Sequence, residues 1–326
     1  IHQGNIDLLP SYLRFVQGVW DSEDLPLNVP RESVQKNVLI EKIKSSLTLR
    51  VLKELEFLSE QNVEKYEKFW KQYGMMLKEG ISSDFKNKNR LMDLLRFNSS
   101  LSGDNSPDAS LKSYSERMRE EQNEIFYVTG SSRESILHNP NLEFFKKQGI
   151  EVLYLTDQID DFMINDMREY DGKTLKNISQ SDIDGISDSD ISAQESLLSK
   201  EEQSDILAFF KNQLKDRVSE VSDSKRLVDS PCSLVTPKDG MTVQMEKMMK
   251  MMDSKFEGEK RNLEVNMGHP IIQNLSEILQ KDKKHPFLKD SVEQLYENSL
   301  LIEGLLENPV KVLTRFQKFM ESAQCL

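Results

Sequence analysis

The stretch that decides the fold class is EIFYVTGSSRESILHNPNLEFFKKQGIEVLYL, residues 124–155. It opens with a short apolar run, Glu124 to Thr129, which ends at Gly130. A second run of the same kind, Ile150 to Leu155, closes it. Such runs predict buried strands, and the polar segment between them is long enough for helix. We therefore predict a βαβ unit with parallel strands and a right-handed crossover.

Helical periodicity dominates the chain before this unit. Apolar residues recur every three or four positions over residues 31–58 and 63–77, and a third helix is expected over residues 84–97. The segment that precedes these helices, residues 21–30, contains two prolines and an Asn, which predict an extended loop.

The chain after the βαβ unit begins with a change in composition. Residues 177–199 hold seven Ser, five acidic residues and no Lys or Arg, which predicts a flexible linker and a domain boundary. The last 40 residues predict a helical hairpin, broken at Asn308-Pro309, with Asn as N-cap and Pro at the first position of the second helix. Two short helices cannot close a core alone, so pairing with a second copy into a four-helix bundle is expected.

Composition narrows the class of protein. The 326 residues carry 43 basic and 55 acidic side chains, a formal charge of −12, which argues against nucleic acid as the main partner. No apolar run is long enough to span a bilayer, so no membrane partner is expected. The two cysteines and four scattered histidines predict neither a disulfide scaffold nor a metal site. Because the chain lacks both an initiator Met and a signal peptide, we interpret it as a fragment or a processed product.

No self-contained active-site motif is found in the sequence. Gly130-Ser131-Ser132 follows a predicted strand and opens a helix, a place where phosphate can bind, but an ordinary turn is the favoured interpretation. Ser131 and Glu134 have the spacing of a capping box for that helix.

A methionine-rich segment allows two interpretations. Met241, Met245, Met248 and Met252 are spaced by 4, 3 and 4 residues, which places them on one helix face, and Met249 and Met251 lie beside them. Methionine at helical spacing is usually core, but when exposed it makes an adaptable apolar binding surface. The pattern alone leaves the two interpretations about even.

Eight segments, in order, resemble one family, the ninety-kilodalton heat-shock chaperones. Each is modest alone, but their order across essentially the whole chain is specific. The segments are DSEDLPLNVPRE (21–32), LLRFNSS (94–100), IFYVTG (125–130), VLYLTD (152–157), GKTL (172–175), RLVDSP (226–231), MEKMM (245–249) and HPII (269–272).

The resemblance implies a multi-domain α+β or α/β protein that comprises the latter part of the family's middle domain and its C-terminal dimerisation domain. Its N-terminal ATP-binding domain would lie upstream. The implied segments are the end of a large αβα sandwich with the catalytic loop (1–60), a helical connector (61–98), a small αβα subdomain with the βαβ unit (99–176), the acidic linker (177–199) and a mixed α/β dimerisation domain ending in the helical hairpin (200–326).

The resemblance also implies roles for individual residues. Arg31 maps onto the catalytic-loop Arg that reaches the γ-phosphate of ATP, with Gln35 as its partner and Asn28 in the same loop. From spacing alone, a surface salt bridge of Arg31 to Glu32 or Asp24 is the favoured interpretation. The implied client-contacting residues are Met241, Met245, Met248, Met249, Met252 and Trp20. The implied dimerisation residues are Leu288, Val292, Leu295, Ile302, Leu306, Leu313, Phe316 and Met320.

The expected activity is therefore that of an ATP-dependent homodimeric chaperone for unfolded or partly folded proteins. Its ATP with magnesium would be bound by the N-terminal domain, so this chain alone should be inactive. The alternative is a dimeric scaffold with no nucleotide cycle. The C-terminus, Glu321 to Leu326, lacks the family's acidic co-chaperone-recruiting tail and an ER-retention signal, which indicates a bacterial cytoplasmic form, with an organellar form second. Pro30 departs from the Ser usual in the family's loop.

Overall fold

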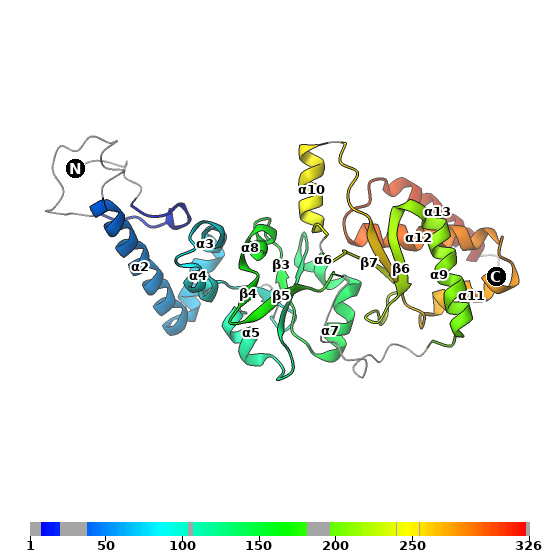
Figure 1. The fold of residues 1–326 in the computed structure, drawn as a ribbon, viewed down its shortest axis with the longest axis horizontal. Helices are drawn as coiled ribbons and strands as arrows, with labels where there is room; N and C mark the ends of the chain where they lie inside the picture. The colour runs from blue at the N-terminus through cyan, green and yellow to red at the C-terminus, as the bar shows by residue number, and fades with distance from the viewer. Residues whose placement is uncertain are drawn as a thin grey trace. The chain divides into compact units, whose positions relative to one another are not determined.

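The computed structural model describes residues 8–19, 38–103, 107–180, 196–238, 240–253 and 255–323. The chain divides into two compact units, Ile1–Arg117 with Phe162–Thr174 and Met118–Asp161 with Leu175–Leu326. Helices and strands follow one another along the described chain (Figure 1), and the strands form two sheets that mix parallel and antiparallel pairs. The predicted mixed α/β class is therefore confirmed, while the finer subdomain boundaries stay a prediction.

The first unit is mainly helical. Asn62 caps the long helix α3 by accepting a 3.1 Å hydrogen bond from the Lys65 N–H. The buried face of α3 includes Tyr66, whose hydroxyl donates to the Leu94 carbonyl at 2.6 Å and so ties α3 to α4. The described elements of this unit are η1 (Ser11–Leu13), α2 (Val38–Gln61), α3 (Val63–Ser83), α4 (Lys88–Leu94), β1 (Asn98–Ser99), α5 (Leu111–Arg117), β4 (Glu169–Tyr170) and the start of β5 (Lys173–Asn177), with α8 (Asp160–Met167) beginning at the boundary.

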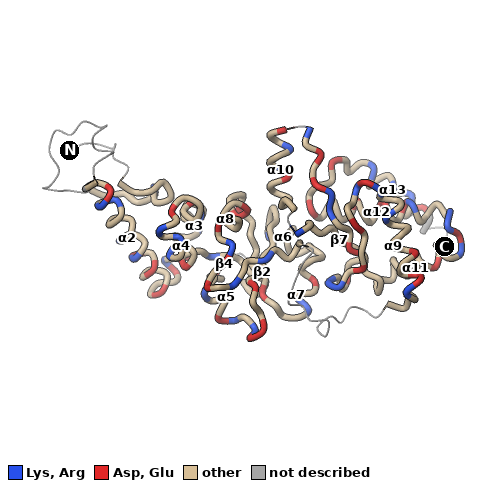
Figure 2. Tube along the Cα trace, viewed as in Figure 1, with Lys and Arg blue, Asp and Glu red and all other residues tan. Residues whose placement is uncertain are grey.

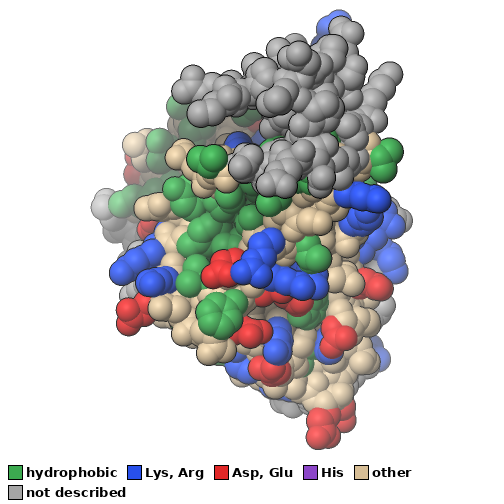
Figure 3. Space-filling model, turned by 90° about the vertical axis from the view of Figure 1, so that its left-hand side faces the viewer, with side chains coloured by type: hydrophobic (Ala, Val, Ile, Leu, Met, Phe, Trp, Pro, Cys, Tyr) green, Lys and Arg blue, Asp and Glu red, His purple; other side chains and the backbone are tan. Residues whose placement is uncertain are grey.

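Hydrophobic side chains gather in the middle of the face that Figure 3 draws, with Lys, Arg, Asp and Glu around them. Large apolar residues of the first unit are also exposed, among them Phe57, 61% exposed on α2. Lys and Arg are interspersed with Asp and Glu along the coloured trace of Figure 2. None of the described helices is both long and apolar enough to cross a bilayer.

The predicted βαβ unit is confirmed in the second unit. Strands β2 (Glu124–Thr129) and β3 (Leu153–Leu155) are parallel, with Tyr127 opposite Leu153. The crossover consists of α6 (Arg133–Leu137), η2 (Pro140–Leu142) and α7 (Glu143–Gln148). Their apolar faces pack with the strands into one core that includes Phe126 and Phe145, whose rings are 4.8 Å apart.

The C-terminal part of the second unit is built on a three-stranded sheet of order β6-β8-β7. Strand β8 (Arg261–Val265) is central, parallel to β6 (Val218–Asp223) and antiparallel to β7 (Cys232–Val235). Helix α9 (Lys200–Leu214) precedes the sheet through η3 (Lys215–Arg217), and α10 (Val243–Met252) lies between β7 and β8 in the chain. Three further helices follow, namely α11 (Pro270–Lys281), α12 (Pro286–Ile302) and α13 (Pro309–Ala323).

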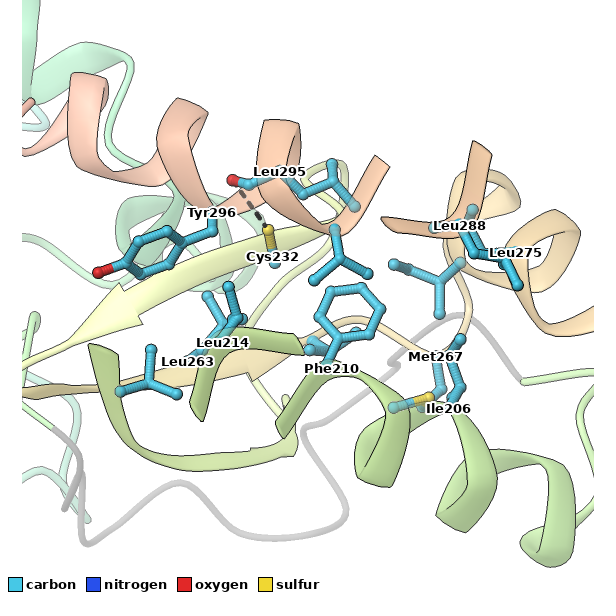
Figure 4. Close-up of a cluster of buried hydrophobic side chains, with 14 of the residues drawn as sticks. Ile206, Phe210, Leu214, Cys232, Leu263, Met267, Leu275, Leu288, Leu295 and Tyr296 are labelled. Carbon is cyan, nitrogen blue, oxygen red and sulfur yellow. Dashed lines mark hydrogen bonds between the residues drawn. The ribbon is translucent and has the colours of Figure 1, made fainter. Parts of the chain in front are cut away.

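The core of this part lies between the sheet and helices α9, α11 and α12. Figure 4 shows Phe210 of α9 and Leu263 of β8 among side chains from α12. The thiol of Cys232, also in this core, lies 3.6 Å from the Leu295 carbonyl, drawn as a dashed line. Burial raises the pKa of the Cys232 thiol to about 11, so this group is an inert part of the core rather than a nucleophile.

Polar contacts join α7 and the residues after β5 to the connection between β6 and β7 and to β8, all within the second unit. The Glu143 carboxylate accepts the backbone N–H of Val228 and of Asp229, each at 2.8 Å. The Arg226 guanidinium pairs with Glu264 at 2.6 Å and donates to the Ile178 carbonyl at 2.8 Å. Residues 177–180 of the predicted linker are thus packed against folded structure, and residues 181–195 lie outside the described part of the chain.

Several predicted bounds are wrong by a few residues. The third helix, predicted over residues 84–97, is α4 (Lys88–Leu94), and the second strand, predicted from Ile150, begins at Leu153. The capping box of α6 is formed by Ser132 and Ser135, not by Ser131 and Glu134. Helix α12 ends at Ile302, not at Asn308-Pro309, because Gly304 adopts a left-handed conformation (φ +67°) and Leu305 N–H bonds back to the Leu300 carbonyl at 2.8 Å. This Schellman-type end places Leu306 outside the helix on which it was predicted.

Candidate functional site: the methionine helix and the C-terminal hairpin

The predicted catalytic-loop residues lie outside the described residues. This applies to Asn28, Arg31 and Gln35, and equally to Trp20. Their roles therefore stay predictions. The other predicted site residues all lie in the second unit, on α10 or on the hairpin of α12 and α13, except Met241. Met241 was predicted on the same helix face as Met245, but α10 begins at Val243 after its N-cap Thr242, so Met241 lies before the helix.

Helix α10 is a short helix that exposes methionine. Its N-cap is Thr242, whose hydroxyl oxygen accepts the Met245 N–H at 3.2 Å. The exposed fraction is 88% for Met251 and 78% for Met252, while Met241 and Met245 are half-buried. Met248 and Met249 are also exposed. The structure thus favours the surface interpretation for Met248, Met249, Met251 and Met252, which are exposed, while Met241 and Met245 are half-buried and none of the six belongs to the buried core.

Charged groups fix α10 to the rest of the unit. The carboxylate of Glu246, at the middle of the helix and buried, pairs with Arg261 of β8 at 2.7 Å. Lys250, one turn later, lies 3.5 Å from Glu246 and 3.1 Å from Glu307. The helix therefore rests on a polar face and turns its methionines outward, the reverse of an ordinary amphipathic helix.

The N-cap of α10 also contacts the start of α8, within the second unit. The Thr242 hydroxyl is hydrogen-bonded to the Asp161 carboxyl, which is 3% exposed. Burial raises the pKa of Asp161 to about 6, the hydrogen bond from Thr242 opposes that rise, and the nearby Asp160 adds to it.

The hairpin divides the predicted dimerisation residues into two groups. Leu288, Val292 and Leu295 are buried in the chain's own core. The exposed fraction is 61% for Leu313, 54% for Phe316 and 52% for Met320. Ile302 is 39% exposed and Leu306 is half-buried. The first group can support a dimer only by positioning α12, whereas the second group is free to contact a partner.

Helix α13 has two faces. Val312 is buried, and Arg315 pairs with Glu297 of α12 at 2.5 Å, so this face holds α13 on α12. The opposite face carries Val310, Leu313, Phe316 and Met320, which are all more than half exposed. Spacings of 3, 3 and 4 residues make them one apolar stripe. Asn308 accepts the Val310 N–H at 3.1 Å, which confirms the predicted cap.

The described residues bear on two predictions from the sequence, those for metal and for phosphate binding. They contain no group of three or more His, Cys, Asp or Glu side chains placed to hold a metal ion. In the Gly130-Ser131-Ser132 turn, the hydroxyls of Ser132 and Ser135 are each engaged with the other residue's backbone N–H at 3.1 Å. These hydroxyls cap the short helix α6, as expected for an ordinary turn.

Sequence reasoning missed the polar side of the site. Glu246 and Arg261 are fifteen residues apart, and only the fold brings them together. One signal was present, since Glu246 is the only acidic residue within the methionine run and Lys250 follows it at i+4 spacing. The exposed Val310 of the α13 stripe was also missed, although its spacing from Leu313 fits the helix period.

A family model and several curated relatives assign this chain to the same family. The family model described as Hsp90 protein matches residues 1–325. The chain belongs to the Hsp90 family. Among the relatives of this Hsp90 chain is the "Chaperone protein HtpG" of Chlorobaculum tepidum, 43% identical over 326 residues, with 97% of this chain and 50% of the relative covered. Those of Chlorobium chlorochromatii and Geobacter sulfurreducens are each 41% identical, covering 97% and 96% of this chain and 50% and 48% of theirs.

The chain thus spans about half the length of the curated Hsp90 relatives that it matches. The resemblance read from the eight sequence segments is confirmed at the level of the family. The two exposed apolar surfaces of this Hsp90 chain, the methionine helix and the α13 stripe, both belong to one compact unit. A binding function and a dimerising function can therefore be carried by the same folded body.

Proposed function

We propose that this chain is the client-binding and dimerising part of an ATP-dependent molecular chaperone. The observation that carries the proposal is the exposure of methionine on α10, where a folded domain presents unpaired, flexible apolar side chains to solvent. Such side chains adapt their shape to varied apolar segments, so they suit partly folded clients with no common sequence.

The proposal assigns dimerisation to the α13 stripe. A stripe of four apolar residues on an exposed helix face is costly in water and is covered when two copies pack face to face. A homodimer with two methionine helices would hold one client at two points, which raises its effective affinity.

The proposal assigns ATP with magnesium to the family's N-terminal domain. Arg31, supplied from this chain, would stabilise charge on the γ-phosphate, with Gln35 and Asn28 supporting it in the loop. Trp20 would contribute to the client surface. Because the relatives are bacterial proteins, a bacterial cytoplasmic location is proposed. No nucleic acid, membrane or acidic-tail co-chaperone is expected as a partner.

Aggregation assays test the client-binding role. The chain should slow the light scattering of a thermally unfolding model protein, and Met251→Ser with Met252→Ser should remove most of that effect. Phe57→Ser is the matched control, because Phe57 is likewise an exposed apolar residue but belongs to the other unit. Equal protection by all three proteins would contradict the proposal.

The second candidate is a dimeric scaffold without a nucleotide cycle, favoured by the fact that the two apolar surfaces lie in one unit. Adding the family's ATP-binding domain upstream separates the two candidates. A chaperone of the proposed kind will then hydrolyse ATP and lose that activity in Arg31→Ala, whereas a scaffold will show no turnover.

A further inference from the structure

Glu246 on the polar face of α10 pairs with Arg261, and the carboxyl of Glu303, whose Oε1 atom is buried, lies near them; we name these three residues the buried ion cluster. Arg261, at the start of β8, is 4% exposed and donates to Glu246 at 2.7 Å and to the Thr236 hydroxyl at 2.8 Å. Buried charges are stable only while they are paired, so Glu246 and Arg261 each depend on the other staying in place.

Glu303 brings the α12–α13 corner, residues 303–308, into the cluster. It directly follows α12, and Arg261 and Lys247 are the positive charges that face it. Burial raises the pKa of Glu303 while these two cations oppose the rise. Among the described residues, its Oε1 atom is buried and has no hydrogen-bond partner. Arg261 is therefore paired with a carboxyl of the methionine helix, and its charge also acts on a carboxyl of the corner.

Two further contacts, closer to the surface, also join α10 to the corner. The Lys250 ammonium, which also lies near Glu246, reaches Glu307 of the corner at 3.1 Å. Lys247 lies so close to the corner that a Cβ built at Gly304 would be 2.9 Å from its Nζ atom. The polar face of α10 thus contacts the corner at two points, through Lys247 beside Gly304 and through Lys250 at Glu307.

The corner in turn leads directly into α13. Asn308 caps α13, and the Arg315–Glu297 pair holds that helix on α12. A shift of the corner relative to β8 would separate Glu303 from Arg261 and Lys250 from Glu307. The polar contacts of α10 and of Arg261 with the corner would then be lost together, and Glu246–Arg261 would remain as the contact of α10 with β8.

We propose that the buried ion cluster couples the seating of the methionine helix to the α12–α13 corner, so that packing of a second copy against α13 regulates how the methionines are presented. The regulatory consequence rests on the proposed function. The coupling itself is a property of the single chain. Glu246 and Arg261 act in it as positioning residues, since neither is exposed to a client.

Hydrogen exchange of the full 326-residue chain tests the coupling, with Glu246→Gln as the variant. The amide keeps the size of the side chain and removes its charge, which weakens the charge-assisted bond to Arg261. We expect amides of α10 to exchange about tenfold faster, and amides of residues 303–309 to accelerate with them. The matched control is Glu277→Gln, which breaks the exposed Glu277–Lys281 pair of α11 and should change neither segment.

Faster exchange confined to α10 would overturn the proposal, as would unchanged exchange in both segments. Amides of α9 report whether the domain stays folded. If their protection also falls, Thr242→Ala replaces Glu246→Gln, because it removes the cap of α10 without altering the cluster. The corner must then loosen as well, and an unchanged corner would overturn the coupling.

Dimer dissociation and aggregation suppression are measured on the same samples. A parent chain that neither dimerises nor protects clients would refute the proposed function, while the exchange result would still decide the coupling. The two failures are therefore distinguishable.

Discussion

The substitution Phe316→Glu tests the dimer surface most sharply. Phe316 is 54% exposed at the centre of the α13 stripe, so burying its remaining surface contributes about 1 kcal/mol per copy. Because a two-fold interface contains the residue twice, its loss costs about 2 kcal/mol, and two carboxylates placed in an apolar contact add at least a similar amount. The sum, about 4 kcal/mol, predicts a dimer dissociation constant about a thousandfold higher.

Light scattering coupled to size exclusion, run over a concentration series, measures this change. Phe57→Glu is the control, since it places the same substitution on an exposed Phe of α2, and it should leave the dimer intact. Substitution is preferable to deletion of the hairpin, because Leu288, Val292 and Leu295 belong to the core of the domain. A Phe316→Glu protein that remains dimeric at the concentrations of the parent would refute the assignment of the stripe.

Three other residues give further predictions. The pKa of Asp161 is raised to about 6, so the unfolded chain loses this proton at lower pH than the folded chain, and the free energy of unfolding should fall by at most about 3 kcal/mol as the pH rises from about 4 to 6. Denaturant midpoints should show this fall in the parent and in the exposed control Asp253→Asn. A fall that persists in Asp161→Asn would contradict the assignment to Asp161. Gly304→Ala should lower stability by about 1 kcal/mol because of its positive φ, whereas Gly103→Ala, in open space, should cost little in thermal melts. In a protein that includes the ATP-binding domain, Arg31→Ala should slow ATP hydrolysis by up to about three powers of ten and leave the ATP affinity nearly unchanged. Arg31→Lys should recover the rate of hydrolysis only in part. Unchanged turnover in Arg31→Ala would remove the catalytic role.

The sequence predicts those parts of the fold that local pattern determines. The strands predicted over residues 124–129 and 150–155 are found, the second only over residues 153–155, because continuous apolar runs between turn residues have few alternatives. The end of α12 was misplaced because Asn308-Pro309 is a strong signal, while the left-handed Gly304 four residues earlier is a weaker one.

For the candidate site, the sequence does not show which apolar residues are buried and which are exposed. Val292 and Leu313 are both apolar residues of helical period, and the sequence does not reveal that one is core and the other surface. That distinction depends on which elements cover each helix, which is a long-range property. The Glu246–Arg261 pair is hidden for the same reason, since its two members belong to a helix and a strand that meet only after folding.

The central claim is that α10 contacts clients, and site-specific photocrosslinking tests it most directly. A photoreactive residue at position 251, which is 88% exposed, is irradiated with a permanently unfolded, reduced and carboxymethylated model protein, and the same residue at position 57 serves as the reference. The account predicts strong crosslinks from position 251 and few from position 57. Equal labelling from both positions, or none from position 251, would contradict it.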